Sequence, residues 1–401
     1  MLKLQRRQRH EVRTVLATLG LLFVLAGCGE TGGSAGLACK MDTAFATVDD
    51  YQLATTTDST AVAMANDSSG NLFVTGAAKD SAGNNHWVVR KSTDKGATWA
   101  TVDDFVQSSL PTLGYGIAIT SAGIFVSGFT STTPNLVVRK STDGGTTWTT
   151  AHLLSSAMAI GVTADTGGNL YVGALTSANG WVVRKSTDAG TTWANADAVA
   201  GSGSLAMRIG IDILGNLLAV GYVGTTNPNW RIRRSTDGGT TWTQVDDLAY
   251  TAGQSTYAQD IAIPIADSTF YSVGYGNAAA AVNHWLVRKS TDSGATWAAN
   301  QDYQLASGKN SMANAAKFDA QGAIYVGGFG VDASNVQHGL VQKSTDGGTT
   351  WTVIEDYART AGQLANIAGL YRHPSGQLFW LGQGNDSSGQ GHWVVRKLAC
   401  L

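Results

Sequence analysis

The chain has 401 residues, of which 14% are charged, and its 27 basic and 29 acidic side chains leave a net charge of −2. It also holds 12 Trp and 49 Gly residues. This composition excludes a disordered chain, and the lack of a basic stripe excludes nucleic acid as a partner. Short Val- and Trp-bearing runs separated by Gly, Ser and Thr indicate an all-β protein with many turns.

Residues 1–27 differ from the rest of the chain. A basic segment is followed by an apolar run from Val15 to Ala26, which is too short to span a bilayer comfortably. The run ends in Leu-Ala-Gly-Cys and resembles the signal of bacterial lipoproteins. The resemblance implies cleavage before Cys28, lipid attachment to that cysteine and a flexible tether over residues 28–38. It implies an exported protein at the outer membrane or cell surface, the periplasmic face included. The alternative is an ordinary secretory signal with a chance cysteine.

Residues 39–401 repeat one pattern with a period of about 45 to 55 residues. In the first unit, apolar runs at 61–65, 72–76, 87–91 and 98–103 predict four short antiparallel strands separated by turns. The third run of each unit begins at Trp87, Leu136, Trp181, Trp230, Trp285, Gly339 and Trp393. The sequence therefore predicts an all-β fold, a seven-bladed β-propeller of four-stranded antiparallel blades.

The last unit lacks a fourth strand, and the start of the repeat region supplies a candidate. Residues 45–50 (Phe-Ala-Thr-Val-Asp-Asp) match residues 99–104 (Trp-Ala-Thr-Val-Asp-Asp) at five of six positions. We expect this N-terminal strand to pair into the last blade and close the ring. Aligned in this way, Cys39 and Cys400 both fall in the turn that the seventh unit lacks, which predicts a disulfide between them. The alternative is two unpaired thiols.

The first six units share an eight-residue phrase, Ser-Thr-Asp-x-Gly-x-Thr-Trp, between their third and fourth strands. It resembles the Asp-box, or BNR repeat, of sialidases and other propeller proteins. The resemblance implies a hairpin turn on the rim away from the usual active-site face. In it, the Asp accepts backbone N–H groups, the Gly takes a positive φ and the Trp buries its ring. The alternative is cation or sugar binding. The residues are Asp94, Gly96, Trp99, Asp143, Gly145, Trp148, Asp188, Gly190, Trp193, Asp237, Gly239, Trp242, Asp292, Gly294, Trp297, Asp346, Gly348 and Trp351.

Other polar residues also follow the repeat. Arginines near the ends of third strands, and His86, His284, His338 and His392 near the starts of third strands, recur at equivalent places. We expect scaffold roles, because equivalent positions on adjacent blades are too far apart to bind one ion. No metal ion or cofactor is predicted.

Acidic residues gather where fourth strands pass to the next blade: Asp49-Asp50, Asp103-Asp104, Asp246-Asp247, Asp302 and Glu355-Asp356. We expect them to rim the face opposite the repeated phrase, as a solvated edge; the alternative is a site for a cation or a basic partner. The candidate ligand-binding residues on this face are Arg208, Tyr115, Tyr257, Asp50, Asp104, Asp247, Asp302 and Asp356.

No catalytic residues are predicted. Sialidases use a Tyr nucleophile and a cluster of three Arg, but the Arg-Ile-Pro motif of that family is absent here. Of four arginines outside the repeat (Arg208, Arg234, Arg359 and Arg372), only Arg208 falls clearly on a predicted innermost strand. Other Asp-box propellers, such as sortilin-like receptors and photosystem assembly factors, bind partners without catalysis. We therefore predict a monomeric, lipid-anchored propeller that binds a protein or glycan through its loops. The alternatives are a divergent glycoside hydrolase of sialidase type and a purely structural envelope protein.

Overall fold

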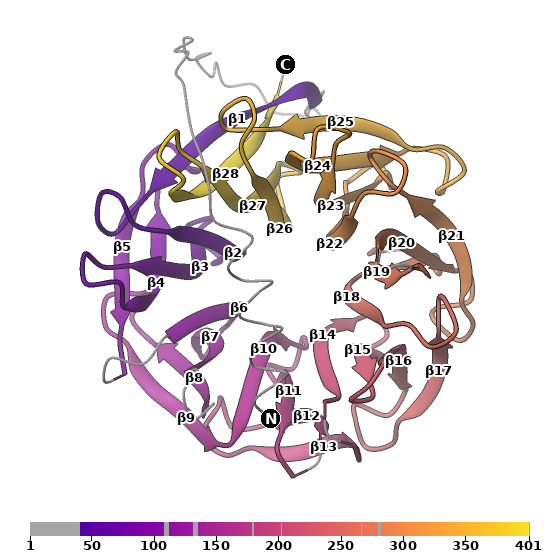
Figure 1. Cartoon of the computed structure of the whole chain (residues 1–401). Coiled ribbons are helices and arrows are strands. Elements are labelled where there is room, and N and C mark those ends of the chain that lie inside the picture. The colour runs from indigo at the N-terminus through magenta and orange to yellow at the C-terminus, as the bar shows by residue number, and fades with distance from the viewer. Residues whose placement is uncertain are drawn as a thin grey trace, which may run out of the picture.

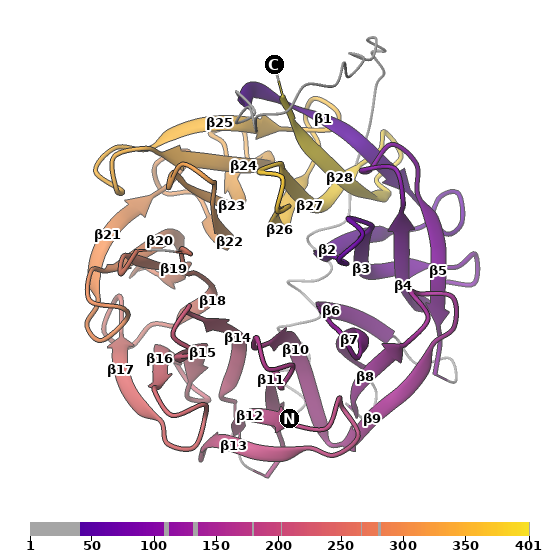
Figure 2. The same cartoon turned by 180° about the vertical axis from the view of Figure 1, so that it is seen from behind.

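The computed structural model describes residues 41–107, 112–130, 135–178, 180–201, 203–265, 267–279 and 282–400. These residues form seven sheets, each of four antiparallel strands, arranged as blades around a central axis (Figures 1 and 2). The predicted all-β, seven-bladed propeller is therefore confirmed. The described part of the chain has no helix of a length and apolarity that could cross a membrane.

The strands of each blade are given from the innermost outward. Blade 1 has β2 (Ser59–Asn66), β3 (Leu72–Lys79), β4 (Asn85–Ser92) and β5 (Ala100–Phe105); blade 2 has β6 (Thr112–Thr120), β7 (Gly123–Thr130), β8 (Asn135–Ser141) and β9 (Thr149–Ser155); blade 3 has β10 (Ala157–Ala164), β11 (Leu170–Thr176), β12 (Gly180–Ser186) and β13 (Ala194–Val199); blade 4 has β14 (Leu205–Ile211), β15 (Leu217–Val223), β16 (Asn229–Ser235) and β17 (Thr243–Leu248). Blade 5 has β18 (Thr256–Ala262), β19 (Phe270–Asn277), β20 (Asn283–Ser290) and β21 (Ala298–Tyr303); blade 6 has β22 (Ser311–Phe318), β23 (Ile324–Val331), β24 (Gln337–Ser344) and β25 (Thr352–Tyr357); blade 7 has β26 (Ala365–Arg372), β27 (Leu378–Asn385), β28 (Gly391–Cys400) and β1 (Met41–Tyr51).

The first and last strands of the chain close the ring, as predicted. β1 pairs antiparallel with β28, with Phe45 opposite Leu398 and Met41 opposite Cys400. Figure 1 shows indigo β1 beside yellow β28 at the outer edge of blade 7. β1 thereby covers the edge of β28 that would otherwise be unpaired, and blade 7 has four strands like the other blades.

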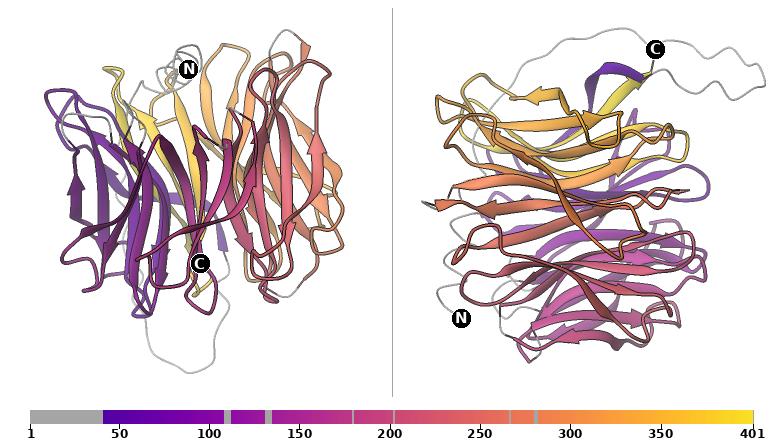
Figure 3. Two further views of the ribbon diagram at one scale, coloured as in Figure 1. Left: turned by 90° about the horizontal axis from the view of Figure 1, so that it is seen from below. Right: turned by 90° about the vertical axis from the view of Figure 1, so that its right-hand side faces the viewer.

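The two ends of the strands define two faces of the ring (Figure 3). Each innermost strand begins after the chain crosses from the preceding blade, and the third strands of blades 1 to 6 each end at the eight-residue phrase. Because the strands of a blade are antiparallel, the six phrases lie at one end, which we name the turn face. The crossings and the loops between second and third strands lie at the other end, which we name the loop face.

The core lies between the blades. Seven apolar clusters each join two neighbouring blades, which explains why the second strands are apolar on both sides. The ring of Trp87 packs on Gly128 of blade 2, where a Cβ atom would come within 2.8 Å of the indole and 1.9 Å of the Leu113 carbonyl. The blade spacing therefore requires glycine here.

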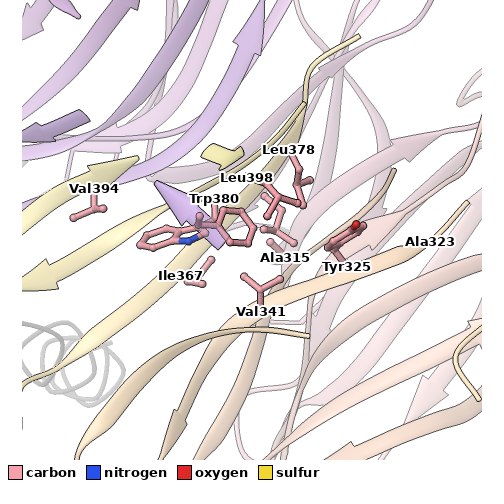
Figure 4. Close-up of a cluster of buried hydrophobic side chains, with 11 residues drawn as sticks. Ala315, Ala323, Tyr325, Val341, Ile367, Leu378, Trp380, Val394 and Leu398 are labelled. Atoms are coloured by element: carbon pink, nitrogen blue, oxygen red, sulfur yellow. The ribbon is translucent and has the colours of Figure 1, made fainter. Parts of the chain in front are cut away.

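Two interfaces compensate for the loss of this Trp. Blade 2 has Leu136 at the Trp position, and blade 3 carries Ala174 where other blades have glycine. Blade 6 has Gly339, and blade 7 fills the space with Ile367, at a position where other blades have Ala or Gly. Figure 4 shows Ile367 and Trp380 packed with Val341 in this cluster. The side-chain volume lost from one blade is thus restored by its neighbour.

Candidate functional site

The eight-residue phrases form closed hydrogen-bonded turns. The Asp94 carboxylate accepts the Thr98 N–H at 2.8 Å, the Thr98 hydroxyl at 2.6 Å and the Ser92 hydroxyl at 2.8 Å. Gly96 has φ of 89°, and the Trp99 indole N–H donates to the Gly96 carbonyl at 3.2 Å. These contacts occupy the carboxylate within its own turn, which leaves it poorly suited to bind a ligand.

The other five turns repeat this geometry. Their aspartates Asp143, Asp188, Asp237, Asp292 and Asp346 accept bonds from the equivalent Thr and Ser residues. Hydrogen bonds from the Thr hydroxyl, and then from the Thr N–H, lower the pKa of all six aspartates to about 2. The turns are therefore anionic and fully bonded at neutral pH.

The arginines of the third strands join neighbouring blades through ion pairs. Arg90 of blade 1 binds the carboxylate of Asp49, in the outer strand of blade 7, at 2.8 and 2.9 Å, and both side chains are almost buried. Equivalent bidentate pairs join Arg139 with Asp103, Arg233 with Asp197 and Arg288 with Asp246. Arg396 donates to Glu355 through one nitrogen and to the Phe45 carbonyl through another. Burial raises the pKa of Asp49, Asp103, Asp246 and Glu355, and the arginines oppose that shift. The expectation that these four acids rim the loop face is wrong, because they turn inward as interblade partners.

Two joints depart from this pattern. Between blades 5 and 6, Gln301 donates to Gln342 at 2.7 Å, so both charges are replaced together. Between blades 2 and 3, His152 stands where the other joints have a carboxylate and stacks on Trp193, with ring centroids 5.5 Å apart. Burial and the charge of Arg184 lower the pKa of His152 to about 4. Arg184 instead donates to Asn195 and to the Trp193 carbonyl.

The predicted aspartates of the loop face already have basic or phenolic partners. The Asp104 carboxylate accepts a hydrogen bond from His86 at 2.6 Å, and His392 and Arg359 both contact Asp50, at 2.7 and 2.6 Å. Asp302 binds His284 and Tyr250, Asp356 binds His338, and Asp247 binds Arg231. The carboxylates of this rim therefore already have hydrogen-bonding partners, which makes the rim a weak site for a basic partner.

The four histidines do not converge on a shared centre. Each lies with its own aspartate on a different blade, and the described residues contain no group of three His, Cys, Asp or Glu side chains that could hold a metal ion. A hollow of about 480 Å³ lies at the rim of blade 6 beside the His338–Asp356 pair, and it is also lined by Asp332 and Val336.

An eighth apolar cluster lies at the loop-face end of the innermost strands, and it joins four blades instead of two. Half-buried side chains pack against buried Phe129, Ile160, Leu205 and Tyr222. We name the half-buried set the axial cluster; it consists of Leu113, Tyr115, Met158, Leu175, Met207 and Tyr257. The predicted ligand residues Tyr115 and Tyr257 belong to it. Tyr115 stacks on Phe129 at 5.5 Å, and Tyr257 contacts both Tyr222 and Tyr275 at 4.8 Å.

Four further members of the axial cluster were not predicted, namely Leu113, Met158, Leu175 and Met207. For Met207 a signal was present in the repeat. Every innermost strand has a β-bulge at one position, where the bulged residues are Val62, Tyr115, Ile160, Met207, Gln259, Asn314 and Ala368. Large apolar residues at this position are consecutive on blades 2, 3 and 4. The cluster therefore lies where blades 2 to 4 differ from the other blades at this position of the repeat.

Arg208 follows the bulge of β14 and lies at the edge of the axial cluster. Its side chain lies over Gly161 of blade 3, where a Cβ atom would be 3.0 Å from the Arg208 Cδ, and its guanidinium donates to the Met207 carbonyl at 3.2 Å. Burial lowers the pKa of Arg208, whereas the nearby carboxylate of Asp260 and phenol of Tyr115 oppose that shift. Burial raises the pKa of Tyr115, and the charge of Arg208 opposes this.

The remaining arginines outside the repeat do not join Arg208. Arg359 binds Asp50 at the outer rim of blade 7. Arg372 ends β26 at the turn face, and Arg234 lies at the turn-face end of β16, opposite Thr243. The three convergent arginines that the sialidase alternative requires are therefore not found among the described residues.

The predictions for Cys28 and Cys39 concern residues outside the described part of the chain, as does any prediction for the side chain of Cys400. The pairing of Met41 with Cys400 is a statement about the backbone alone.

Comparisons with solved structures agree with the fold. YCF48 bound to D1 peptide is similar with a TM-score of 0.56 and 13% identity, over 88% of this chain and 96% of that chain. The extracellular domain of the putative one component system BT4673 from B. thetaiotaomicron gives 0.53 and 12%, over 88% of this chain and 39% of that one. A Penicillium chrysogenum alpha-L-arabinanase complexed with arabinobiose gives 0.52 and 13%, over 89% and 99%.

Identities at this level show a shared seven-bladed propeller and nothing finer. No protein-family model matches the chain. No curated protein sequence matches it either.

Proposed function

We propose that this propeller is a binding protein that holds a segment of another polypeptide on its axial cluster. The main support for this proposal is the axial cluster itself, a half-buried set of Tyr, Met and Leu side chains spanning blades 2 to 5. The other seven clusters already join every pair of neighbouring blades, and the eighth leaves its large apolar side chains only half-buried. Tyrosine and methionine suit binding surfaces, because both present large apolar area, and methionine adapts its shape to the partner.

A neighbour of the same fold supports a peptide ligand. YCF48 was solved bound to D1 peptide, whereas the arabinanase was solved with arabinobiose. The axial cluster favours the first kind of ligand, since a sugar site would call for several polar groups around an aromatic platform. The hydrolase alternative has less support, because Arg208 is the one arginine outside the repeat that lies at the axial cluster.

The cellular setting is also a proposal. The lipoprotein-like leader would attach the mature chain to a membrane at Cys28, with the outer membrane or the cell surface as its site. A Cys39–Cys400 disulfide would seal the ring; the pairing of β1 with β28, with Met41 opposite Cys400, brings the two ends of the propeller together. Mass spectrometry of a non-reduced digest tests both: we expect an acylated Cys28 peptide and a linked Cys39–Cys400 peptide. Recovery of both thiols free would contradict the disulfide.

The function is tested by presenting the labelled mature protein to a peptide array and a glycan array. We expect binding to apolar peptides. Met158→Gln removes apolar surface at nearly constant volume, and we expect it to weaken binding by at least about 5-fold. Val353→Thr is the matched control, because Val353 is an exposed apolar residue (40% exposed) on β25, away from the axial cluster.

Two outcomes would contradict the proposal. One is binding to glycans alone. The other is equal loss of peptide binding in Met158→Gln and Val353→Thr, which would show that the axial cluster is not the site.

A further inference from the structure

Arg208 does not belong to the scaffold pattern of this chain. On the other innermost strands, the residue that follows the bulge is Ala63, Gly116, Gly161, Asp260, Ala315 or Gly369. Five of the seven blades therefore fold with no side chain larger than a methyl group at this position. A long cation here is not required to form the blade.

Five of the six arginines at the repeated third-strand position have carboxylate partners, and the sixth, Arg184, donates to Asn195 and the Trp193 carbonyl. Arg90, Arg139, Arg233, Arg288 and Arg396 each pair with an acid from the preceding blade. Arg208 forms no salt bridge with any described residue, and its one hydrogen bond is to the Met207 carbonyl beside it. An arginine has five N–H donors, so most of its donor capacity remains for another group.

Asp260 occupies on blade 5 the position that Arg208 occupies on blade 4, but its carboxylate is directed toward blade 6. Asp260 of blade 5 is buried, accepts the Ala316 N–H of blade 6 at 3.1 Å, and has Lys317 Nζ at 3.8 Å. Its charge acts on Arg208 without a direct contact between them. The guanidinium is thus a partly desolvated cation at the edge of an apolar surface, and it has its strongest affinity for a carboxylate.

We infer that Arg208 anchors the terminal carboxylate of the bound polypeptide while the axial cluster holds the apolar side chains that precede it. The inference rests on the proposed function and names which part of a partner is bound. A terminal carboxylate suits a site on the innermost strands, because only one length of polypeptide has to reach the ring axis. An internal Asp or Glu would need room for two lengths, one entering and one leaving. The ligand is therefore an apolar carboxy-terminal segment.

Fluorescein-labelled octapeptides with three apolar residues at the C-terminus test this by fluorescence anisotropy with the full mature protein. Each is made as the free acid, as the C-terminal amide, and as an amide with one internal Glu. We expect the free acid to bind about 10-fold or more tightly than either amide, since a charge-assisted hydrogen bond is lost. In Arg208→Gln we expect acid and amide to bind alike, with the weaker apolar binding retained.

Arg372→Gln is the control, because Arg372 also lies on an innermost strand but at the turn face. It should keep the preference for the free acid. Arg208→Gln should fold, because no salt bridge is removed, and its melting temperature checks this. Equal binding of acid and amide by the wild type would overturn the role of Arg208 and leave the proposed function standing. If the amide with an internal Glu binds as tightly as the free acid, the inference that Arg208 selects the C-terminal carboxylate is wrong. Binding of none of the peptides would count against the proposed function itself.

Discussion

Equivalent arginines stand in different surroundings at two neighbouring interfaces of the ring. One interface lies between blades 1 and 2, and the other lies between blades 2 and 3. Arg139 pairs with the carboxylate of Asp103. In the second joint the neutral ring of His152 takes the place of that carboxylate, and Arg184 donates to Asn195 and the Trp193 carbonyl. The strands on both sides have the same register, since Asp103 lies opposite Val89 and His152 lies opposite Val138. The difference shows that the propeller tolerates the loss of one interblade ion pair when the remaining arginine finds neutral partners.

Breaking the first joint has the largest expected effect. Asp103→Asn keeps the side-chain volume but leaves Arg139 without a counter-charge in a nearly buried site. We expect a loss of about 3–5 kcal/mol in the free energy of unfolding, measured by chemical denaturation. Asp104→Asn is the control, because Asp104 is 41% exposed and pairs only with His86. It should cost about 1 kcal/mol or less. Equal losses in the two variants would refute the importance of the joint.

Replacing both partners tests whether the ion pair or the space it fills is needed. The double variant Asp103→Gln with Arg139→Gln reproduces the Gln301–Gln342 joint that this chain already uses between blades 5 and 6. We expect a stability within about 1 kcal/mol of the wild type, because no uncompensated charge remains. A loss as large as that of Asp103→Asn would show that the glutamine pair depends on its own blades.

The second joint can be converted to resemble the first. His152→Asp gives Arg184 a carboxylate, at the cost of the stacking on Trp193. We expect a net gain of about 1 kcal/mol at pH 7, measured by thermal and chemical denaturation. Trp193→Phe, alone and with His152→Asp, separates the stacking from the new ion pair. A loss of stability in His152→Asp in both backgrounds would contradict the expectation.

The same variant predicts a change in pH dependence. The pKa of His152 is lowered in the fold, so the unfolded chain binds its proton first as the pH falls. The stability that neutral His152 contributes is present above about pH 6.5 and is lost between about pH 6.5 and pH 4. We expect this part of the decline to disappear in His152→Asp, as seen in melting temperatures across that range.

The smallest effect near neutral pH concerns the repeated turns. Their aspartates have a folded-state pKa of about 2, below the ordinary value of 3.8, so their contribution is present above about pH 4 and is lost as the pH falls toward 2. Asp143→Asn should therefore flatten the loss of stability between pH 4 and pH 2. Proton uptake on unfolding, measured by calorimetry at pH 3, should fall in this variant; unchanged uptake would contradict the assignment.

The repeat made the fold predictable. Seven third strands, turn residues between them and the match of residues 45–50 to 99–104 determined the blade number and the closing strand. The interblade ion pairs were missed because their members are separated by about 36 to 42 residues and belong to different repeats. The joint replacement of an acid by Gln301 and of an arginine by Gln342 was a signal. It can be recognised only when one knows that the fourth strand of one blade contacts the third strand of the next blade.

The candidate site was predictable only in part. Arg208 stood out because it lies outside the repeated arginine positions, and Tyr115 and Tyr257 were predicted beside it on the ligand face. The structure places the two tyrosines in the axial cluster and Arg208 close to Tyr115. Leu113, Met158, Leu175 and Met207 were missed because an apolar residue on a strand is expected in any core. Met207 is the bulged residue of β14, and the position of that bulge depends on hydrogen-bond register, which the sequence does not show.

The closure of the ring by β1 has a consequence for synthesis of the chain. β1 ends at Tyr51 and β28 begins at Gly391, so the ribosome makes the first strand long before its partner exists. At typical rates of translation the delay is roughly 20 to 70 seconds. Throughout that interval β1 is an unpaired strand, which is the kind of segment that associates with other chains. Asp49 and Asp50 give it two adjacent negative charges, so the acids that later bind Arg90 and His392 also discourage premature pairing while the nascent chain waits.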